Sequence, residues 1–297
     1  MKGILMQRRY FIKTLSVLTL IAMSPSLLLA RGKKEKKDRH TNRPLDRLRG
    51  NRNRDTDITP TPETLKLLIP LYSYPVLESG ESAWQPLIDL KQNYPEVEIV
   101  AIVNPNNGHF REQDSNFYQG IQRLTAANIH VVGYVYTQYG LRLNHDILDD
   151  VTAWQEFYQE AGVRGIFFDE VSNTSDDLSH YQSLSEQTKA QGFTSIILNP
   201  GTTTDQSYVD ANIADIIVTY EETNREQIIN PPISYNTPTE TTRLATLIYE
   251  MEDNTIDDLI SFAQEHQFNY VYFTDDGFDG NPWDDFSSYL EEQATKV

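Results

Sequence analysis

The chain contains no cysteine. This absence excludes a disulfide framework, a thiolate nucleophile and any zinc or iron–sulfur site built on cysteine. Basic residues are scarce over most of the chain, because residues 1–54 hold 15 of the 25 Lys and Arg but only 3 of the 43 Asp and Glu. The remaining body is therefore strongly acidic. Such a body repels nucleic-acid phosphates, so we expect no nucleic-acid partner.

The front of the chain has the pattern of an export signal. Arg8 and Arg9 precede an apolar run from Leu15 to Ala30, which is shorter than the ~20 residues that span a bilayer. The paired arginines leave a twin-arginine signal and an ordinary secretory signal both open. We predict that residues 1–30 are a signal peptide, or an anchor if uncleaved. The protein is then exported to the periplasm or the extracellular space.

The composition of residues 31–62 predicts a basic, disordered linker. Residues 31–54 are rich in Lys and Arg and carry almost no apolar side chain, so they have nothing to bury. This stretch is suited to contact with an anionic membrane or cell surface, and equally to the role of a solvated spacer. Thr59-Pro60-Thr61-Pro62 marks the boundary to a single domain over residues 63–297.

From residue 63 onward, short apolar runs alternate with helical patterns. Eight runs are strand candidates: Lys66–Tyr72, Glu98–Asn104, His130–Thr137, Gly165–Asp169, Ser195–Asn199, Ile213–Tyr220, Leu244–Tyr249 and Tyr270–Thr274. Helical patterns occupy Glu81–Tyr94, Ser115–Asn128, Asp146–Ala161, Asp177–Gln191, Asp257–Gln267 and Trp283–Gln293, with shorter segments at Asp205–Asn212 and Thr223–Asn230. This alternation predicts an α/β fold, a (β/α)8 TIM-type barrel. A doubly wound sheet is the alternative, but the turn after the first strand is not a Gly-rich phosphate loop.

Polar side chains gather where the predicted strands end, which is where barrel enzymes place their sites. The acids there are Asp169, Glu170, Glu221, Glu222, Asp275 and Asp276. The tyrosines and amides are Tyr72, Tyr74, Tyr136, Tyr139, Tyr220, Tyr249, Asn104, Asn106 and Asn199. Aromatic faces stack on sugar rings, while amides and acids bond sugar hydroxyls, so the rim suits a carbohydrate.

Glycoside cleavage needs two carboxyl groups, one protonated and one ionised. Asp169 and Glu221 end the fourth and sixth predicted strands, so we expect them to face each other across the mouth. Because side chains alternate along a strand, Asp169 and Glu170 do not both point inward unless the strand bulges at its end.

The order of these segments resembles the spherulin-4 family. The resemblance rests on Pro70-Leu71-Tyr72, Asn104-Pro105-Asn106, Gly133-Tyr134-Val135, Tyr139-Gly140, Gly165-Ile166-Phe167-Phe168-Asp169-Glu170, Leu198-Asn199-Pro200-Gly201-Thr202, Tyr220-Glu221, Thr274-Asp275-Asp276 and Asn281-Pro282. It implies a barrel of the endo-α-1,4-galactosaminidase type that cleaves α-1,4-linked galactosamine or N-acetylgalactosamine polymers of biofilms. No His-plus-carboxylate cluster in the sequence has clear metal-ligand spacing, so we expect no cofactor and no metal. By the resemblance Asp169 is the nucleophile, Glu221 the acid/base and Glu170 an essential neighbour. From their chemistry and position, we expect the other rim residues to bind substrate.

Some points stay open at the level of sequence. Glu222 directly follows Glu221, so either glutamate could be the acid/base. The loop Asn107-Gly108-His109-Phe110 and the strand end Tyr249-Glu250 depart from the family pattern. A non-catalytic polysaccharide-binding barrel and a metal-assisted phosphodiesterase are the alternative functions. The acidic body favours a partly deacetylated, cationic polymer as substrate.

Overall fold

The computed structural model describes residues 64–224, 232, 235, 242–251, 255–277 and 280–297. The signal segment 1–30 and the linker 31–62 lie outside the described residues, as does most of the helical segment expected at 223–230. Those expectations therefore stay predictions, and so does the domain boundary at residue 63.

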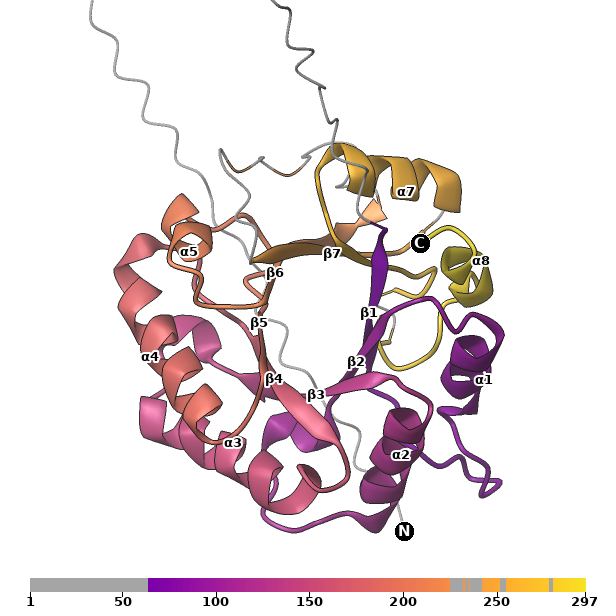
Figure 1. Ribbon diagram of the computed structural model, residues 1–297, viewed down its shortest axis with the longest axis horizontal. Coiled ribbons are helices and arrows are strands. Elements are labelled where there is room, and N and C mark those ends of the chain that lie inside the picture. Colours follow the sequence, from indigo (N-terminus) through magenta and orange to yellow (C-terminus); the bar gives the residue numbers. More distant parts are fainter. Residues whose placement is uncertain (1–63, 225–231, 233–234, 236–241, 252–254, 278–279) are drawn as a thin grey trace, which may run out of the picture. The chain divides into compact units, whose positions relative to one another are not determined.

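Eight parallel strands close into a barrel in sequence order, from β1 next to β2 round to β8 next to β1 (Figure 1). Their bounds are β1 Lys66–Leu71, β2 Ile99–Val103, β3 His130–Tyr136, β4 Val163–Asp169, β5 Ser195–Leu198, β6 Ile216–Thr223, β7 Arg243–Tyr249 and β8 Tyr270–Phe273. The predicted (β/α)8 barrel is confirmed. All eight predicted strands exist, with ends shifted by up to three residues.

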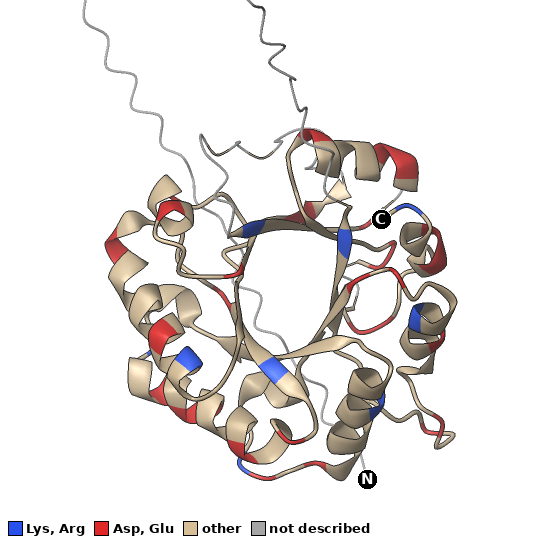
Figure 2. Ribbon diagram, viewed as in Figure 1, with Lys and Arg blue, Asp and Glu red and all other residues tan. Residues whose placement is uncertain are grey.

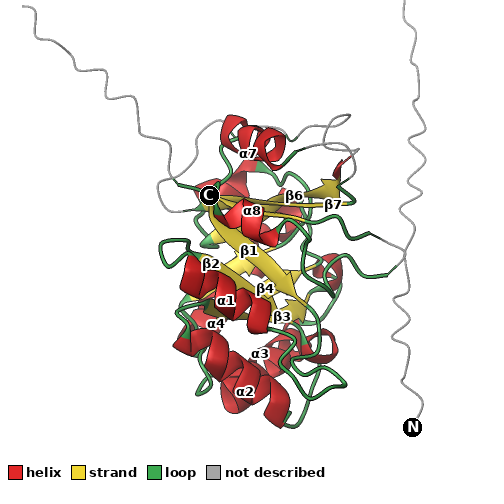
Figure 3. Ribbon diagram, turned by 90° about the vertical axis from the view of Figure 1, so that its right-hand side faces the viewer, coloured by secondary structure: helices red, strands yellow, loops and turns green. Residues whose placement is uncertain are grey.

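Helices follow the strands and form an outer layer around the barrel (Figure 3). The helices are α1 Gln85–Asn93, α2 Ser115–Ala126, α3 Asn144–Tyr158, α4 Leu178–Ala190, α5 Gln206–Asp210, α7 Ile256–Glu265 and α8 Leu290–Ala294. Short 3-10 turns lie at η1 Pro105–Gly108, η2 Gln138–Gly140 and η3 Ser175–Asp177. In the described part of the chain, no helix has the length and apolarity to cross a membrane. Figure 2 shows acidic residues on the outer helices, including α7 and α8.

The strands are apolar on both faces because each packs inward on the barrel core and outward on helices. The side chains of β2 are all buried, for example. On β3, a Cβ at Gly133 would meet the indole of Trp154 in α3 at 2.4 Å, so this residue faces the helices. Tyr134 next to it therefore faces the interior, where its ring stacks on Phe167 of β4 at 6.0 Å.

The expectation of a helix over Trp283–Gln293 is wrong in its first half, because α8 begins only at Leu290. Side-chain oxygens take the backbone N–H groups that a helix would need. Asn281 accepts from the N–H of Trp283, Asp285 from that of Phe286, and Asp275 from that of Ser288. Such local bonds compete with helix formation.

Strand β6 contains an irregularity that decides which of its side chains face inward. Its register against β7 shifts between Val218 and Tyr220, so Thr219 is an extra residue on the β6 side. A bulge of this kind reverses the inward and outward alternation beyond it. The side chains after Thr219 therefore point to the opposite faces from those that strict alternation predicts.

Gly108 fixes the loop after β2 against β3, and its substitution provides a test of the fold. A Cβ at Gly108 would lie 2.2 Å from the backbone oxygen of Tyr134, and φ is +74°. We expect Gly108→Ala to lower the free energy of unfolding by about 3 kcal/mol, measured by urea denaturation. Gly80 is the matched control, because φ is +88° but nothing lies within 4 Å of its added Cβ. Gly80→Ala should cost only about 1 kcal/mol, and equal losses would contradict a steric origin.

Candidate active site

The carboxylate of Asp169 is held by two side chains at the C-terminal mouth of the barrel. The hydroxyl of Tyr134 donates to its Oδ2 at 2.7 Å, and the amide of Asn199 donates to its Oδ1 at 2.8 Å. These residues come from β3, from the end of β4 and from the position after β5. Adjacent parallel strands thus bring residues 30 to 35 positions apart into contact.

Asn199 joins Asp169 to Glu221. Its Nδ2 also donates to Oε2 of Glu221 at 2.7 Å, while its Oδ1 accepts from the N–H of Gly201 at 2.9 Å. The backbone donor fixes the orientation of the amide, because only the oxygen can accept it. Oδ1 of Asp169 and Oε2 of Glu221 each lie within 2.8 Å of this one nitrogen, so these two oxygens are at most about 5.5 Å apart. The two acids therefore meet at the barrel mouth, as the sequence predicts.

Glu170 leaves the strand in a left-handed conformation with φ of +53°. This conformation is unfavourable for a residue with a Cβ and is found where surrounding contacts impose it. Here Thr137 Oγ1 donates to the carbonyl of Glu170 at 2.8 Å, and the N–H of Tyr139 donates to the same oxygen. The chain turns at Glu170, so the alternation of a regular strand ends at Asp169.

Two tyrosines lie in the field of the acids. Burial, and next the charge of Asp169, raise the pKa of Tyr134 well above its usual value, so its hydroxyl stays a donor at neutral pH. Burial and the charges of Glu170, Asp169 and Glu221, in that order, raise the pKa of Tyr139 to about 12. Tyr139 is half exposed and sits at φ of +55° in the η2 turn, within range of the electrostatic field of the three acids.

Three more of the expected rim tyrosines lie at or just beyond the C-terminal ends of their strands. Tyr72 meets the ring of Tyr134 edge-on at 5.6 Å. The backbone of Tyr136 pairs in register with that of Asp169, and its ring is covered by Arg142 at 4.2 Å. Tyr249 is buried against Trp283 at 5.8 Å. The structure brings these side chains to the C-terminal side of the barrel from three different strands.

Other predicted site residues are placed elsewhere or serve the loops. Tyr220 is buried against Phe262 of α7 at 5.9 Å, so it faces the helices and not the mouth, because the bulge at Thr219 turns it outward. Tyr74 donates to Asp114, the N-cap of α2. Both carboxylate oxygens of Asp275 accept from Ser288, whose bonds hold its pKa below the usual value despite partial burial.

The remaining residues of the predicted site mostly make local contacts. The side chain of Asn106 bonds the carbonyl of His109 inside the η1 turn. One oxygen of Asp276 accepts from Gly277. The side chain of Asn104, at the end of β2, has a buried oxygen without a hydrogen bond among the described residues. Glu222 pairs with Ile248 of β7, one position beyond the glutamate that Asn199 contacts.

Sequence reasoning missed Tyr134 as a site residue, although it bonds Asp169 directly. The signal that could have found it is its position two residues before Tyr136 on the same strand, which puts both on one face. Across the described part of the chain, no group of three or more His, Cys, Asp and Glu side chains is arranged to hold a metal ion.

The molecule is thus a (β/α)8 barrel with acids from β4 and β6 joined at its C-terminal mouth. The model of the family described as "Spherulation-specific family 4" matches residues 66–297, and the chain belongs to that family. Spherulin-4 of Physarum polycephalum is 37% identical over 162 residues, which are 54% of this chain and 46% of that relative. The match therefore spans about half the length of this relative.

A solved structure has the same fold. Sph3 of Aspergillus clavatus, crystallised in complex with GalNAc, superposes with a TM-score of 0.68 at 24% sequence identity. The match covers 78% of this chain and 97% of that one. At this level of identity the likeness establishes the shared barrel fold.

Proposed function

We propose that this protein is an exported, endo-acting glycoside hydrolase that cleaves an α-1,4-linked galactosamine or N-acetylgalactosamine polymer. One observation carries the proposal: a single amide, Asn199, contacts carboxyl oxygens of both Asp169 and Glu221. The family membership and the GalNAc bound to the structurally similar Sph3 support an amino-sugar substrate.

The separation of the two acids favours a double-displacement mechanism with retention of configuration. Carboxyl groups ~5–5.5 Å apart are typical of retaining enzymes, whereas ~6.5–9.5 Å leaves room for the water of an inverting one. The upper limit of about 5.5 Å between Asp169 Oδ1 and Glu221 Oε2 fits the first class.

In the first step the carboxylate of Asp169 attacks the anomeric carbon while Glu221 donates its proton to the leaving oxygen. The bond between sugar and leaving group breaks, and a glycosyl ester forms on Asp169. In the second step Glu221 removes a proton from water, which attacks the same carbon and releases the ester. Asp169 accepts bonds from Tyr134 and Asn199, which favours its ionised form for the attack.

A panel of amino-sugar polymers tests this proposal. The purified protein is incubated with each polymer, and released oligosaccharides are detected by mass spectrometry. We expect internal cleavage of an α-1,4-linked galactosamine or N-acetylgalactosamine polymer, and NMR of the first product should show the α-anomer. Binding of such a polymer with no new reducing ends would instead support a non-catalytic binding protein.

Tyr134 provides a test of how Asp169 is positioned. Tyr134→Phe removes the hydroxyl that donates to Asp169 at 2.7 Å and keeps the ring that stacks on Phe167. A hydrogen bond to a charged group contributes about 1.5–3 kcal/mol, so we expect kcat/KM to fall by about 10- to 100-fold. Tyr158→Phe is the control, since its hydroxyl also takes part in one bond, from the N–H of Asp114, away from the acids. Equal activity of the two variants would contradict this role.

A further inference from the structure

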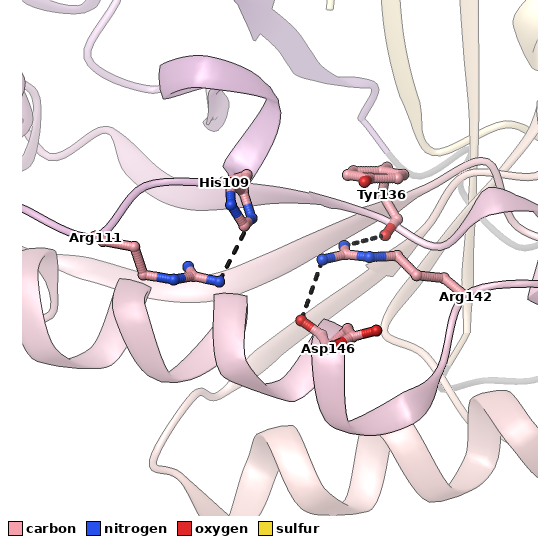
Figure 4. Close-up of a pocket in the computed structure, with 5 residues that line it drawn as sticks. All are labelled: His109, Arg111, Tyr136, Arg142 and Asp146. Carbon is pink, nitrogen blue, oxygen red and sulfur yellow. Dashed lines mark hydrogen bonds between the residues drawn. The ribbon is translucent and has the colours of Figure 1, made fainter.

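A pocket of about 300 Å³ opens between loops at the C-terminal side of the barrel. It is lined by five side chains, which are His109, Arg111, Tyr136, Arg142 and Asp146 (Figure 4). They come from the loop after β2, the end of β3, the loop after β3 and the first turn of α3. All four segments lie at the C-terminal side of the barrel.

The pocket adjoins the proposed catalytic centre through Tyr136. The backbone of this residue pairs with that of Asp169 in the β3–β4 register, and neighbouring strands are ~4.8 Å apart. The following residue, Thr137, donates its N–H to the carbonyl of Asp169 at 2.9 Å. A polymer that passes over the acids can therefore place another sugar unit against this pocket.

The cations of the pocket are held by a carboxylate beneath it. Asp150 of α3 is fully buried, and its oxygens accept from Arg111 at 3.0 Å and from Arg142. The imidazole of His109 lies 3.2 Å from the same carboxylate. The half-exposed carboxylate of Asp146, 3.3 Å from His145, also lines the pocket, so two guanidinium groups and two carboxylates meet here. Selection of a ligand therefore depends on the directions of the hydrogen-bond donors and not on net charge.

Two of the lining side chains, Arg111 and His109, are exposed, and a third, Arg142, is almost buried. Arg142 is only 10% exposed and donates to the carbonyls of Tyr136 and Asp146, so it forms the wall. Arg111 and His109 are 55% and 56% exposed, and the guanidinium of Arg111 points toward the imidazole (Figure 4).

A guanidinium offers five N–H donors and no acceptor. Nη1 of Arg111 already donates to the carbonyl of Phe110 at 2.8 Å and to Asp150, and Nη2 lies 3.5 Å from the imidazole of His109. The remaining N–H groups of Arg111, on Nε and Nη2, form a donor edge that suits a group that only accepts.

We propose that this pocket is a sugar subsite that selects a unit carrying an acceptor-only substituent, a carboxylate or an N-acyl carbonyl, over one carrying a free ammonium. The inference rests on the proposed function for the identity of the polymer. It reverses, at this position, the preference for cationic sugars that the acidic body suggests. The acids at the mouth and the donor edge of the pocket then contact different sugar units of one polymer.

Binding measurements on the full chain test the subsite without requiring turnover. Calorimetry compares three ligands: an N-acetylgalactosamine oligomer, its fully deacetylated form and a galacturonic acid oligomer. In wild-type protein we expect the ammonium form to bind weakest. Arg111→Gln should reduce that preference about tenfold, which corresponds to loss of one charge-assisted hydrogen bond. Arg123→Gln, an exposed arginine of α2 that bonds Gln85, should bind all three as wild type does.

Salt dependence of binding distinguishes a carboxylate from an N-acyl group as the natural substituent. If the natural substituent is a carboxylate, its advantage should fall steeply between 20 and 500 mM salt, whereas that of an N-acyl group should persist. Arg111→Lys covers the case in which Arg111→Gln unfolds, because lysine keeps a positive charge beside Asp150 but lacks the planar fork. We expect this variant to lose about threefold in preference, with the melting temperature of the wild type.

Two results would overturn the subsite. One is an ammonium oligomer that binds as tightly as the other two ligands, and the other is a preference that survives both substitutions of Arg111. The outcome is independent of catalysis. A preference that depends on Arg111, without hydrolysis, would support the subsite and contradict the proposed enzyme activity. Hydrolysis without that preference would support the enzyme activity and contradict the subsite.

Discussion

Asp169→Asn is expected to abolish turnover while leaving the fold and polymer binding intact. In the proposed mechanism this carboxylate forms the bond to the anomeric carbon, and an amide is too weak a nucleophile to replace it. We expect kcat to fall by about 10³-fold or more. The measurement is the rate at which reducing ends appear from the polymer, with binding followed separately by calorimetry.

The structure explains why this substitution should preserve the site. The new amide can turn its oxygen to the N–H of Asn199 and its nitrogen to the hydroxyl of Tyr134, which then accepts instead of donating. Tyr134 and Asn199 thus each keep one hydrogen bond to residue 169 after the exchange. A melting temperature within about 2 °C of the wild type is therefore expected, and wild-type activity in a purified, folded Asp169→Asn variant would end the assignment.

The barrel itself could be predicted because its signal is local and repeated. Eight apolar runs, each followed by a turn or a helical pattern, define the alternation whatever the exact strand ends are. The joining of Asp169 and Glu221 at the mouth follows from the same rule, since the C-terminal ends of parallel strands share one side. The amide that joins the two acids belongs to Asn199, which directly follows β5 and is also one of the site residues predicted from the sequence.

The misses have a common physical origin in tertiary packing. Strands buried on both faces show no alternation of polar and apolar residues, so this pattern does not distinguish inward Tyr134 from outward Val135, and only the spacing from Tyr136 does. The extra residue at Thr219 is likewise invisible in the sequence, which is why Tyr220 was expected at the mouth. The pocket lined by His109 and Arg111 depends on Asp150, which lies some 40 positions along the chain from the loop that carries them.

The adjacent glutamates of β6 give the sharpest test of that bulge. Glu221 shares the amide of Asn199 with Asp169, and neighbouring strand positions point to opposite faces, so Glu222 points away from that contact. We expect Glu221→Gln to lower kcat by about 10²- to 10⁴-fold on the natural polymer, the range for removal of a general acid/base. Glu222→Gln, the matched control one residue along, should stay within about threefold of wild type.

A second substrate separates an acid/base role from a structural one. A synthetic glycoside with a nitrophenolate leaving group needs little protonation, so Glu221→Gln should form the glycosyl ester on it at close to the wild-type rate. Release of that ester still needs a base, and the ester should therefore accumulate and be visible by mass spectrometry on the Asp169 peptide. If Glu222→Gln shows these effects and Glu221→Gln does not, the register of β6 and the assignment built on it are both wrong.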